Sequence, residues 1–336
     1  MKVLVAVDND QLAKTAFASI EQKEWPEGTE FIIVHVIESE KYNLTGSLKS
    51  IAHQEALDQE HEREYQKQHI WLRDLALQYK RTLTNVRSVV ITGHIDYCIA
   101  QVANVLKPDH VVMVSHDRTS KQRLWIQSIC SAVVDKLPCS VEVLRPTHSA
   151  VASFPGRLLL AVDGSENALE ALEWLLNQNL PEDVQIKMIM VLDSQKIRDL
   201  NEARNIHSSS MSKRWSTKYN FRLQAREWFD EQLNILKSEL KNHHVEGAIL
   251  EGDPVSSIVA AADHWNADLI VIGPHSVGDA AVDGMGDETE STPRALVEQS
   301  HRDILVIKTG ASIQEGFKWK NKETYSAFCE LGKVSK

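Results

Sequence analysis

The segment GPHSVGDAAVDGMGDETES at 273–291 contains the residues that most favour phosphate chemistry. It follows an apolar run, ADLIVIG, and contains four glycines. Glycine-rich turns bind phosphate because their backbone N–H groups can approach the oxygens without an intervening side chain. The same segment carries five carboxylates and no Lys or Arg, and carboxylates repel a triphosphate unless a cation bridges them. Two interpretations therefore stand side by side: a phosphate cradle, or an acidic loop that has lost that role.

Three aspartates of this segment, Asp279, Asp283 and Asp287, are spaced by four residues. On a helix they would share one face and could hold a divalent cation. The D-x-D-x-D-G spacing of a calcium loop is absent, and Gly284 and Gly286 disfavour a regular helix. We therefore predict a solvated acidic loop and no metal site.

Residues for covalent catalysis do not form a recognisable pattern. No G-x-S-x-G elbow occurs, and Ser, His and acidic residues follow no triad order. The cysteines form no C-x-x-C pair; they are Cys98, Cys130, Cys139 and Cys329. Cys98 and Cys130 lie in apolar helical patterns, which predicts buried, reduced thiols. We predict no catalytic residue and no enzyme activity, with slow ATP hydrolysis left open.

Composition narrows the class of protein. The chain has 336 residues, 43% of them hydrophobic and 25% charged, which is typical of a soluble globular protein of about two domains. A net charge of −10 disfavours nucleic-acid and anionic-membrane binding, which require clustered Lys and Arg. The N-terminus, MKVLVAVDND, has too short an apolar run for a signal peptide and predicts a strand. We expect a cytoplasmic protein that binds neither nucleic acid nor membrane.

The chain repeats itself after about 145 residues. The aligned segments are KVLVAVDND (2–10) with RLLLAVDGS (157–165), FIIVHVIES (31–39) with IKMIMVLDS (186–194), and VEVLR (141–145) with ILVIK (304–308). Fixed-period similarity indicates that one structural unit occurs twice. The predicted organisation is a first domain at 1–146, a linker at 147–156, a second domain at 157–309 and a C-terminal tail at 310–336.

Each copy alternates apolar runs with helical patterns. Predicted strands lie at 3–7, 31–37, 86–92, 110–114 and 141–145, and again at 158–162, 186–192, 245–251, 269–272 and 304–308. Predicted helices lie at 11–22, 52–80, 95–106 and 127–137, and again at 166–178, about 221–242, 255–265 and 292–299. Because the strands are continuously apolar, we predict parallel sheets covered on both faces. The fold class is α/β, with two tandem five-stranded, three-layer sandwiches of Rossmann-like type, in which ligands bind at the carboxyl ends of the strands.

Four motifs, in this order, carry a family resemblance: AVDGS after the first strand, EGDP before the third helix, ADLIVIG at the fourth strand, and a late S-x3-A-x2-[DE] helix. Together they resemble the universal stress protein family, over both copies. The resemblance implies a tandem member with the adenine-nucleotide α-hydrolase-like fold. Many members pair their fifth strands in dimers, so this chain could form an internal pseudo-dimer between the strand from Val141 to Leu144 and the strand from Ile304 to Ile307. That pairing would cover two edge strands.

The resemblance also implies two functional branches, one of which binds ATP through a late loop of the form G-x2-G-x9-G-S. In the first copy all three glycine positions are replaced, and the residues there are Val114, Asp117 and Gln127, before Ser128. In the second copy Gly273 remains, Ser276 and Glu290 replace the other two, and four extra residues precede Ser291. The resemblance therefore predicts no phosphate site in the first copy and an eroded one in the second.

The adenosine side of the second copy is better preserved. By the resemblance, Val162, Asp163, Gly164, Ser165 and Val191 match positions that hold base and ribose. Three further predicted contacts are Gly273, His275 and Ser291. We expect no bound cofactor, with ATP in the second copy as the open alternative.

These observations predict a non-catalytic stress-response or regulatory module. It would act through protein partners, self-association or ligand contacts, with weak or no ATP binding. The alternative is a nucleotide sensor for ATP or AMP that uses only the second copy, with slow hydrolysis. An α/β enzyme related by fold alone is a third alternative, because a fold does not dictate a function.

Two further features keep both a functional and a structural interpretation. His116 and His275 each follow a fourth strand and could donate to an anion, or could be ordinary loop residues. The insert NIHSSSMSKRWSTKYNFR at 205–222 is Ser-rich and basic with interleaved aromatics. It is predicted to be a disordered insertion, with a lid, docking segment or phosphorylation target as the functional alternative.

Overall fold

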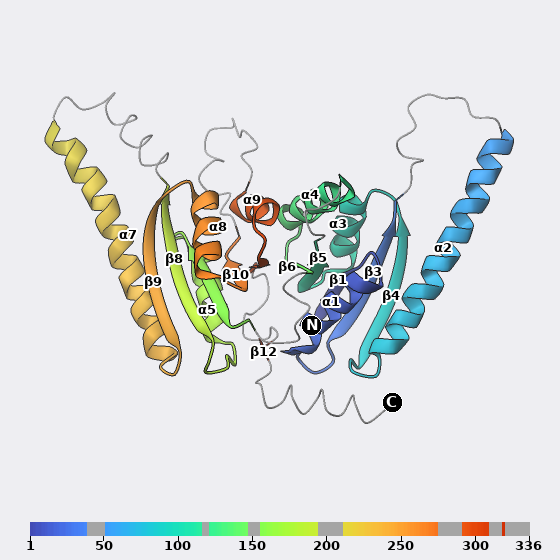
Figure 1. The fold of residues 1–336 in the computed structure, drawn as a ribbon, viewed down its shortest axis with the longest axis horizontal. Helices are drawn as coiled ribbons and strands as arrows, with labels where there is room; N and C mark the ends of the chain where they lie inside the picture. Colours follow the sequence, from blue (N-terminus) through green and yellow to red (C-terminus); the bar gives the residue numbers. More distant parts are fainter. Residues whose placement is uncertain are drawn as a thin grey trace. The chain divides into compact units, whose positions relative to one another are not determined.

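The structure is a computed structural model that describes residues 1–38, 51–115, 121–146, 155–193, 211–274, 291–308 and 318–319. The chain divides into two compact units. Unit 1 comprises Met1–Ala152 and Gly310–Phe317, and unit 2 comprises Ser153–Thr309 and Lys318–Lys336. Each contains a sheet flanked by helices (Figure 1). Among the described residues, no helix is long and apolar enough to cross a membrane.

Unit 1 is a five-stranded parallel sheet with strand order β4-β3-β1-β5-β6. Its elements are β1 (Lys2–Ala6), α1 (Asp10–Glu21), β2 (Lys23–Glu24), β3 (Glu30–Ile37), α2 (Ile51–Tyr79), β4 (Asn85–Thr92), α3 (Ile95–Leu106), β5 (His110–Val114), α4 (Lys121–Lys136) and β6 (Ser140–Leu144). In the register, Val3 of β1 lies opposite Phe31 of β3 and His110 of β5. The predicted strands are confirmed to within one residue, whereas α4 begins six residues before its predicted start at 127.

Unit 2 repeats this order as β9-β8-β7-β10-β11, again parallel. Its elements are β7 (Arg157–Val162), α5 (Glu166–Leu176), β8 (Gln185–Asp193), α7 (Met211–Glu239), β9 (His244–Gly252), α8 (Pro254–Trp265), β10 (Leu269–Ile272), α9 (Thr292–Gln299) and β11 (Asp303–Val306), followed by β12 (Lys318–Trp319). The prediction of a loop throughout 205–222 is wrong, because α7 begins at Met211. The Ser-rich composition hid a helix of 29 residues.

The core of unit 1 shows why its sheet needs helices on both faces. Phe31 and Ile33 of β3 belong to one cluster with residues of α1 and α2, while the alternate residue Ile32 is buried outside that cluster. Because neighbouring side chains on a strand point to opposite faces, Ile32 faces the other side of the sheet. Helix α3 contacts β3, so it provides the cover there.

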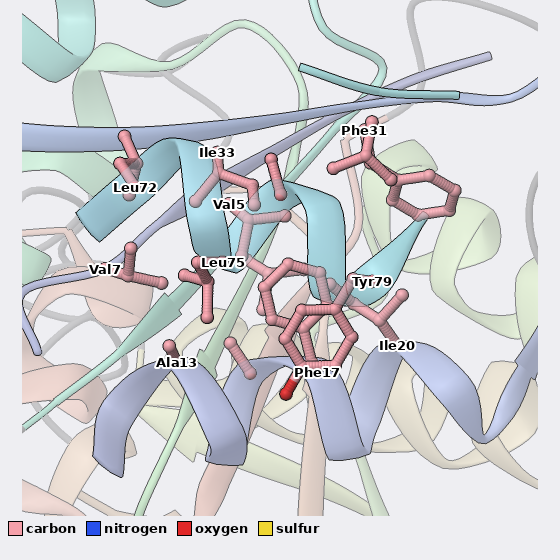
Figure 2. Packing of buried hydrophobic residues seen from close by; sticks show 14 of the residues in the cluster. Val5, Val7, Ala13, Phe17, Ile20, Phe31, Ile33, Leu72, Leu75 and Tyr79 are labelled. Atoms are coloured by element: carbon pink, nitrogen blue, oxygen red, sulfur yellow. The ribbon is translucent and has the colours of Figure 1, made fainter. Parts of the chain in front are cut away.

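Helices α1 and α2 meet through an aromatic stack (Figure 2). The rings of Phe17 and Tyr79 lie 3.6 Å apart between centroids, with an interplanar angle of 11°. Burial, together with the nearby carboxylates of Glu21 and Asp10, raises the pKa of Tyr79 to about 12. The stack fixes the lower part of α2 against α1, and α2 also packs on β3 and β4.

Candidate functional site

The turn after β7 positions three of the predicted site residues in unit 2. Gly164 has φ +83, a left-handed backbone conformation that favours glycine. The Asp163 carboxylate Oδ1 accepts from the Ser165 backbone N–H at 3.0 Å and from its hydroxyl at 2.6 Å. Ser165 in turn caps α5, since its Oγ accepts from the N–H of Ala168. Asp163 therefore holds an exposed turn that leads into a helix N-terminus.

The parallel register brings the other described site residues to the same edge of the sheet. Val162 of β7 lies opposite Met190 of β8, so Val191 is the next residue along the neighbouring strand. Gly273 directly follows β10, which pairs with β7 on its other side. The carboxyl ends of these three strands therefore gather Val162, Val191 and Gly273 at one edge, where ligands of such sheets bind.

Ser291 is the first residue described after the masked part of the late loop. It is buried, it caps α9, and its Oγ accepts from the N–H of Arg294 at 3.2 Å. His275 of unit 2 and His116 of unit 1 lie outside the described residues, as do Asp279, Asp283 and Asp287. In the described part of the chain, no three His, Cys, Asp or Glu residues are grouped to hold a metal ion.

Unit 1 builds the equivalent turn differently. Asn9 stands where unit 2 has Gly164, and its φ of −153 is extended backbone. Its side-chain oxygen accepts from the N–H groups of Gln11 and Leu12, both at 3.1 Å, so Asn9 rather than the predicted Asp10 caps α1. Asp10 instead accepts from the indole N–H of Trp71 on α2. In unit 1 the turn and α2 are therefore joined by a side-chain contact.

A buried histidine supports this arrangement. His35 of β3 donates from Nδ1 to the carbonyl of Val7 at 3.0 Å, and its ring meets the Trp71 ring edge-on at 5.4 Å. A carbonyl oxygen accepts only, which assigns the proton to Nδ1. The carboxyl end of β1 is thus tied to β3 and α2 by side chains of unit 1 itself.

The EGDP motif of unit 2 has a structural basis. Gly252 has φ +156, and a Cβ there would lie 2.8 Å from Ser257 Oγ, which is too close. Asp253 caps α8 as predicted, accepting from the Ser256 hydroxyl and backbone N–H, and these hydrogen bonds lower its pKa. Pro254 occupies the first turn, as predicted. In unit 1 the residue at this cap is His94, whose side chain makes no capping bond.

Sequence reasoning missed a charged cluster inside unit 1. The ammonium of Lys23 lies 2.7 Å from both carboxylate oxygens of Glu142 and 2.6 Å from Ser19 Oγ. His110 Nε2 lies 3.3 Å from Glu142 Oε2. The side chains of Lys23, His110 and Glu142 are 0%, 1% and 2% exposed. A glutamate inside the apolar run VEVL was the available signal.

The chemistry of this buried ion cluster, defined as Ser19, Lys23, His110 and Glu142, is that of a packed interior. Burial alone would raise the pKa of Glu142, but the Lys23 ammonium and the His110 N–H outweigh it and lower that pKa to about 2. Burial lowers the pKa of His110 despite the adjacent carboxylate. The result is one cation, one anion and a neutral imidazole that donates from Nε2, out of reach of solvent.

The described cysteines agree with the predicted thiols. Cys98, Cys130 and Cys139 are free and buried. Burial raises the pKa of Cys130 to about 11, and burial, followed by the Asp96 carboxylate, raises the pKa of Cys98. Because the thiolate is the reactive form, these are unreactive core side chains.

Comparisons with known proteins agree with the repeat. The model of the universal stress protein family matches residues 1–145 and again 156–308. A universal stress protein from Archaeoglobus fulgidus DSM 4304 has a TM-score of 0.54 at 17% identity, covering 92% of this chain and 96% of that one. A putative universal stress protein from Pseudomonas aeruginosa UCBPP-PA14 has a TM-score of 0.47 at 14% identity, with 99% and 97% covered.

A third solved structure is described as a universal stress protein in complex with cAMP. It has a TM-score of 0.31 at 19% identity and covers 47% of this chain and 100% of its own. No functionally curated protein shows significant similarity to the chain. The family match spans both units, in the order that their repeated strands and turns require. The chain therefore belongs to the universal stress protein family, as a tandem member with two copies of its domain.

Proposed function

We propose that the chain is a non-catalytic stress-response module that acts through protein or ligand contacts and binds ATP weakly or not at all. The observation that carries the proposal is the state of the helix starts at the ligand edge. Anions bind there through free backbone N–H groups. Asn9 occupies the N–H groups of Gln11 and Leu12, and Ser291 occupies that of Arg294.

The late loop of unit 2 supports the same proposal by its charge. Between Gly273 and Ser291 it carries five carboxylates and no Lys or Arg. A triphosphate at this edge would meet repulsion from these carboxylates unless a divalent cation intervened. Two of the three glycine positions expected for close backbone approach are occupied by Ser276 and Glu290.

Equilibrium dialysis of the intact chain with ATP, with and without Mg²⁺, tests this proposal. We expect no saturable one-to-one binding at micromolar ATP under either condition. Tight stoichiometric binding would contradict the proposal. Phosphate release from ATP should equal that of a protein-free blank, and turnover that scales with protein concentration would contradict a non-catalytic role.

The second candidate function is a nucleotide sensor that uses unit 2 alone. It is favoured by the difference between Gly164, whose left-handed turn carries no side chain, and Asn9, whose side chain fills the same turn in unit 1. It predicts that Asp163→Ala abolishes ATP or AMP binding while Asp8→Ala leaves it unchanged. Ser165→Ala is the matched control, since it disturbs the same cap and keeps the carboxylate.

We further infer a cytoplasmic location and an internal pseudo-dimer formed by β6 and β11. Internal pairing would use the edges that otherwise join two chains. Light scattering coupled to size exclusion should then give the mass of one chain. A mass that grows to two chains with concentration would contradict the internal pairing and favour self-association. Cell fractionation tests the location.

A further inference from the structure

The two units differ most at the positions of the buried ion cluster. The internal alignment places unit 2 counterparts at shifts of 155, 159 and 163 residues. The counterparts of Ser19, Lys23, His110 and Glu142 are Trp174, Gln178, Leu269 and Leu305. All four counterparts are buried.

The strand register confirms that these positions are equivalent. Glu142 of β6 lies opposite Val112 of β5, and Leu305 of β11 lies opposite Val271 of β10. Val112 and Val271 are themselves 159 residues apart, the same shift that relates His110 to Leu269. The same interior location is therefore ionic in unit 1 and uncharged in unit 2.

The charge balance of the cluster holds for one protonation state. Lys23 is opposed by Glu142, and the neutral imidazole of His110 donates to the carboxylate. A proton added to His110 leaves two cations against one anion. A proton added to Glu142 leaves the Lys23 ammonium without its counter-charge. Either event creates an uncompensated buried positive charge, which is strongly unfavourable in a protein interior.

The groups that face the cluster come from four elements. Ser19 belongs to α1, Lys23 to β2, His110 to β5 and Glu142 to β6. The further carboxylate that acts on His110 is Asp109, which accepts from the backbone N–H of Lys2 at 2.7 Å. Acid therefore reaches the contacts that hold the end of α1 and β2 to the sheet.

We propose that the buried ion cluster is an acid-sensitive switch that loosens unit 1 while unit 2 stays folded. The element that moves is the connection from α1 to β2. Ser19 and Lys23 attach it to β6 through Glu142. In unit 2 the corresponding connection carries Trp174 and Gln178, neither of which titrates, so acid has no equivalent effect.

The direction of the pH effect follows from linkage. The pKa of His110 is lowered in the fold, so its contribution is complete above its ordinary value of 6.5 and is lost as the pH falls below it. The pKa of Glu142 is lowered from 4.5 to about 2, so its contribution is lost between those values. Both groups weaken unit 1 on acidification, the histidine first.

Hydrogen exchange of the intact chain, followed by mass spectrometry at pH 7.5, 6.0 and 5.0, tests the switch. Exchange is divided by the intrinsic rate at each pH. In peptides from α1, β2 and β6 we expect corrected exchange to rise by up to about tenfold per pH unit below pH 6.5. Peptides from α5 and β11 should not change. An equal response in both units, or none in unit 1, would overturn the proposal.

A transplant of unit 2 residues into unit 1 identifies the source of the effect. The variant is Lys23→Gln with His110→Leu and Glu142→Leu, and it should abolish the extra exchange of unit 1 at pH 5.0. Lys136→Gln is the control, because it breaks an exposed ion pair with Asp96 in the same unit and should keep the response. A response that survives the transplant contradicts the proposal.

An NMR titration of the wild-type chain keeps the test independent of variant folding. The His110 imidazole resonance should move with a pKa below 6.5, and unit 1 signals should broaden over the same range. A His110 pKa at or above 6.5 would overturn the switch.

Discussion

Where unit 1 buries Glu142 on β6, unit 2 buries Leu305 on β11, within the same strand order and register. A buried ion pair is weak support for stability, since desolvation offsets much of the attraction, yet removing one partner is costly. The apolar version in unit 2 shows that this fold does not require the charges. The comparison indicates that the charges of unit 1 contribute sensitivity rather than net stability.

The ligand edge shows a second difference. Unit 2 ends β7 with Asp163 and Gly164 in an exposed turn, whereas unit 1 fills the same turn with the capping side chain of Asn9 and ties Asp10 to Trp71. The open turn costs unit 2 a glycine in a helix-start region. The filled turn leaves unit 1 with its own side chains where a ligand would bind. Repetition of the fold therefore did not repeat the site.

The largest expected effect comes from breaking the ion pair of unit 1. Glu142→Leu leaves the Lys23 ammonium buried and unpaired, so we expect a loss of about 3–5 kcal/mol in the free energy of unfolding of unit 1. Guanidinium unfolding monitored by hydrogen exchange of each unit measures it. Lys23→Met combined with Glu142→Leu should restore most of the loss. A single variant that costs less than about 1 kcal/mol would contradict an unpaired buried charge.

Gly164→Ala tests the open turn of unit 2. A Cβ at φ +83 has room, with Met190 Cε at 3.7 Å, so the cost is conformational, about 1–2 kcal/mol. Thermal unfolding followed by unit-specific exchange should place this loss in unit 2. At the matched position, Asn9→Gly removes a cap and should cost a few tenths of a kcal/mol. Equal costs at both positions would show that the two turns are not conformationally distinct.

The starts of α3 and α8 provide an effect of opposite sign. His94→Asp installs in unit 1 the cap that Asp253 provides in unit 2, and should stabilise unit 1 by about 1 kcal/mol. Asp253→Ala should destabilise unit 2 by a similar amount. The pKa of Asp253 is lowered, so its contribution is present above its ordinary pKa of 3.8 and is lost below it. Chemical unfolding at pH 7 and pH 3 measures both; unchanged stability in both variants would exclude capping as the difference.

The smallest effect concerns an exposed pair that unit 2 lacks. Lys136 donates to Asp96 at 2.8 Å across α4 and α3, and this hydrogen bond lowers the pKa of Asp96. The counterparts in unit 2 are Gln299 and Val255. Because solvent screens exposed pairs, Lys136→Gln should change unit 1 by less than about 1 kcal/mol. Urea unfolding at low and high salt checks this, and a loss larger than that of Gly164→Ala would contradict it.

Most elements were predictable from short stretches. The apolar runs, the glycine turns and the cap at Asp253 each depend on a few adjacent residues, so strand limits agreed to within one or two residues throughout. The starts of α4 and α7 were missed because composition is a weak guide to helix ends where polar residues predominate. The candidate site was predictable as a set of strand-end residues, and the parallel register then brought Val162, Val191 and Gly273 to one edge.

The sequence by itself determined the repeat, the parallel sheets and the family, because periodicity and turn chemistry are encoded locally and occur twice. Only the tertiary structure decided that Lys23 and Glu142, 119 residues apart, share one carboxylate–ammonium contact with Ser19 and His110. It also decided that Trp71 of α2 reaches the turn of unit 1. Charges in separate elements can neutralise one another only after the sheet has placed them side by side, and no local pattern records that placement.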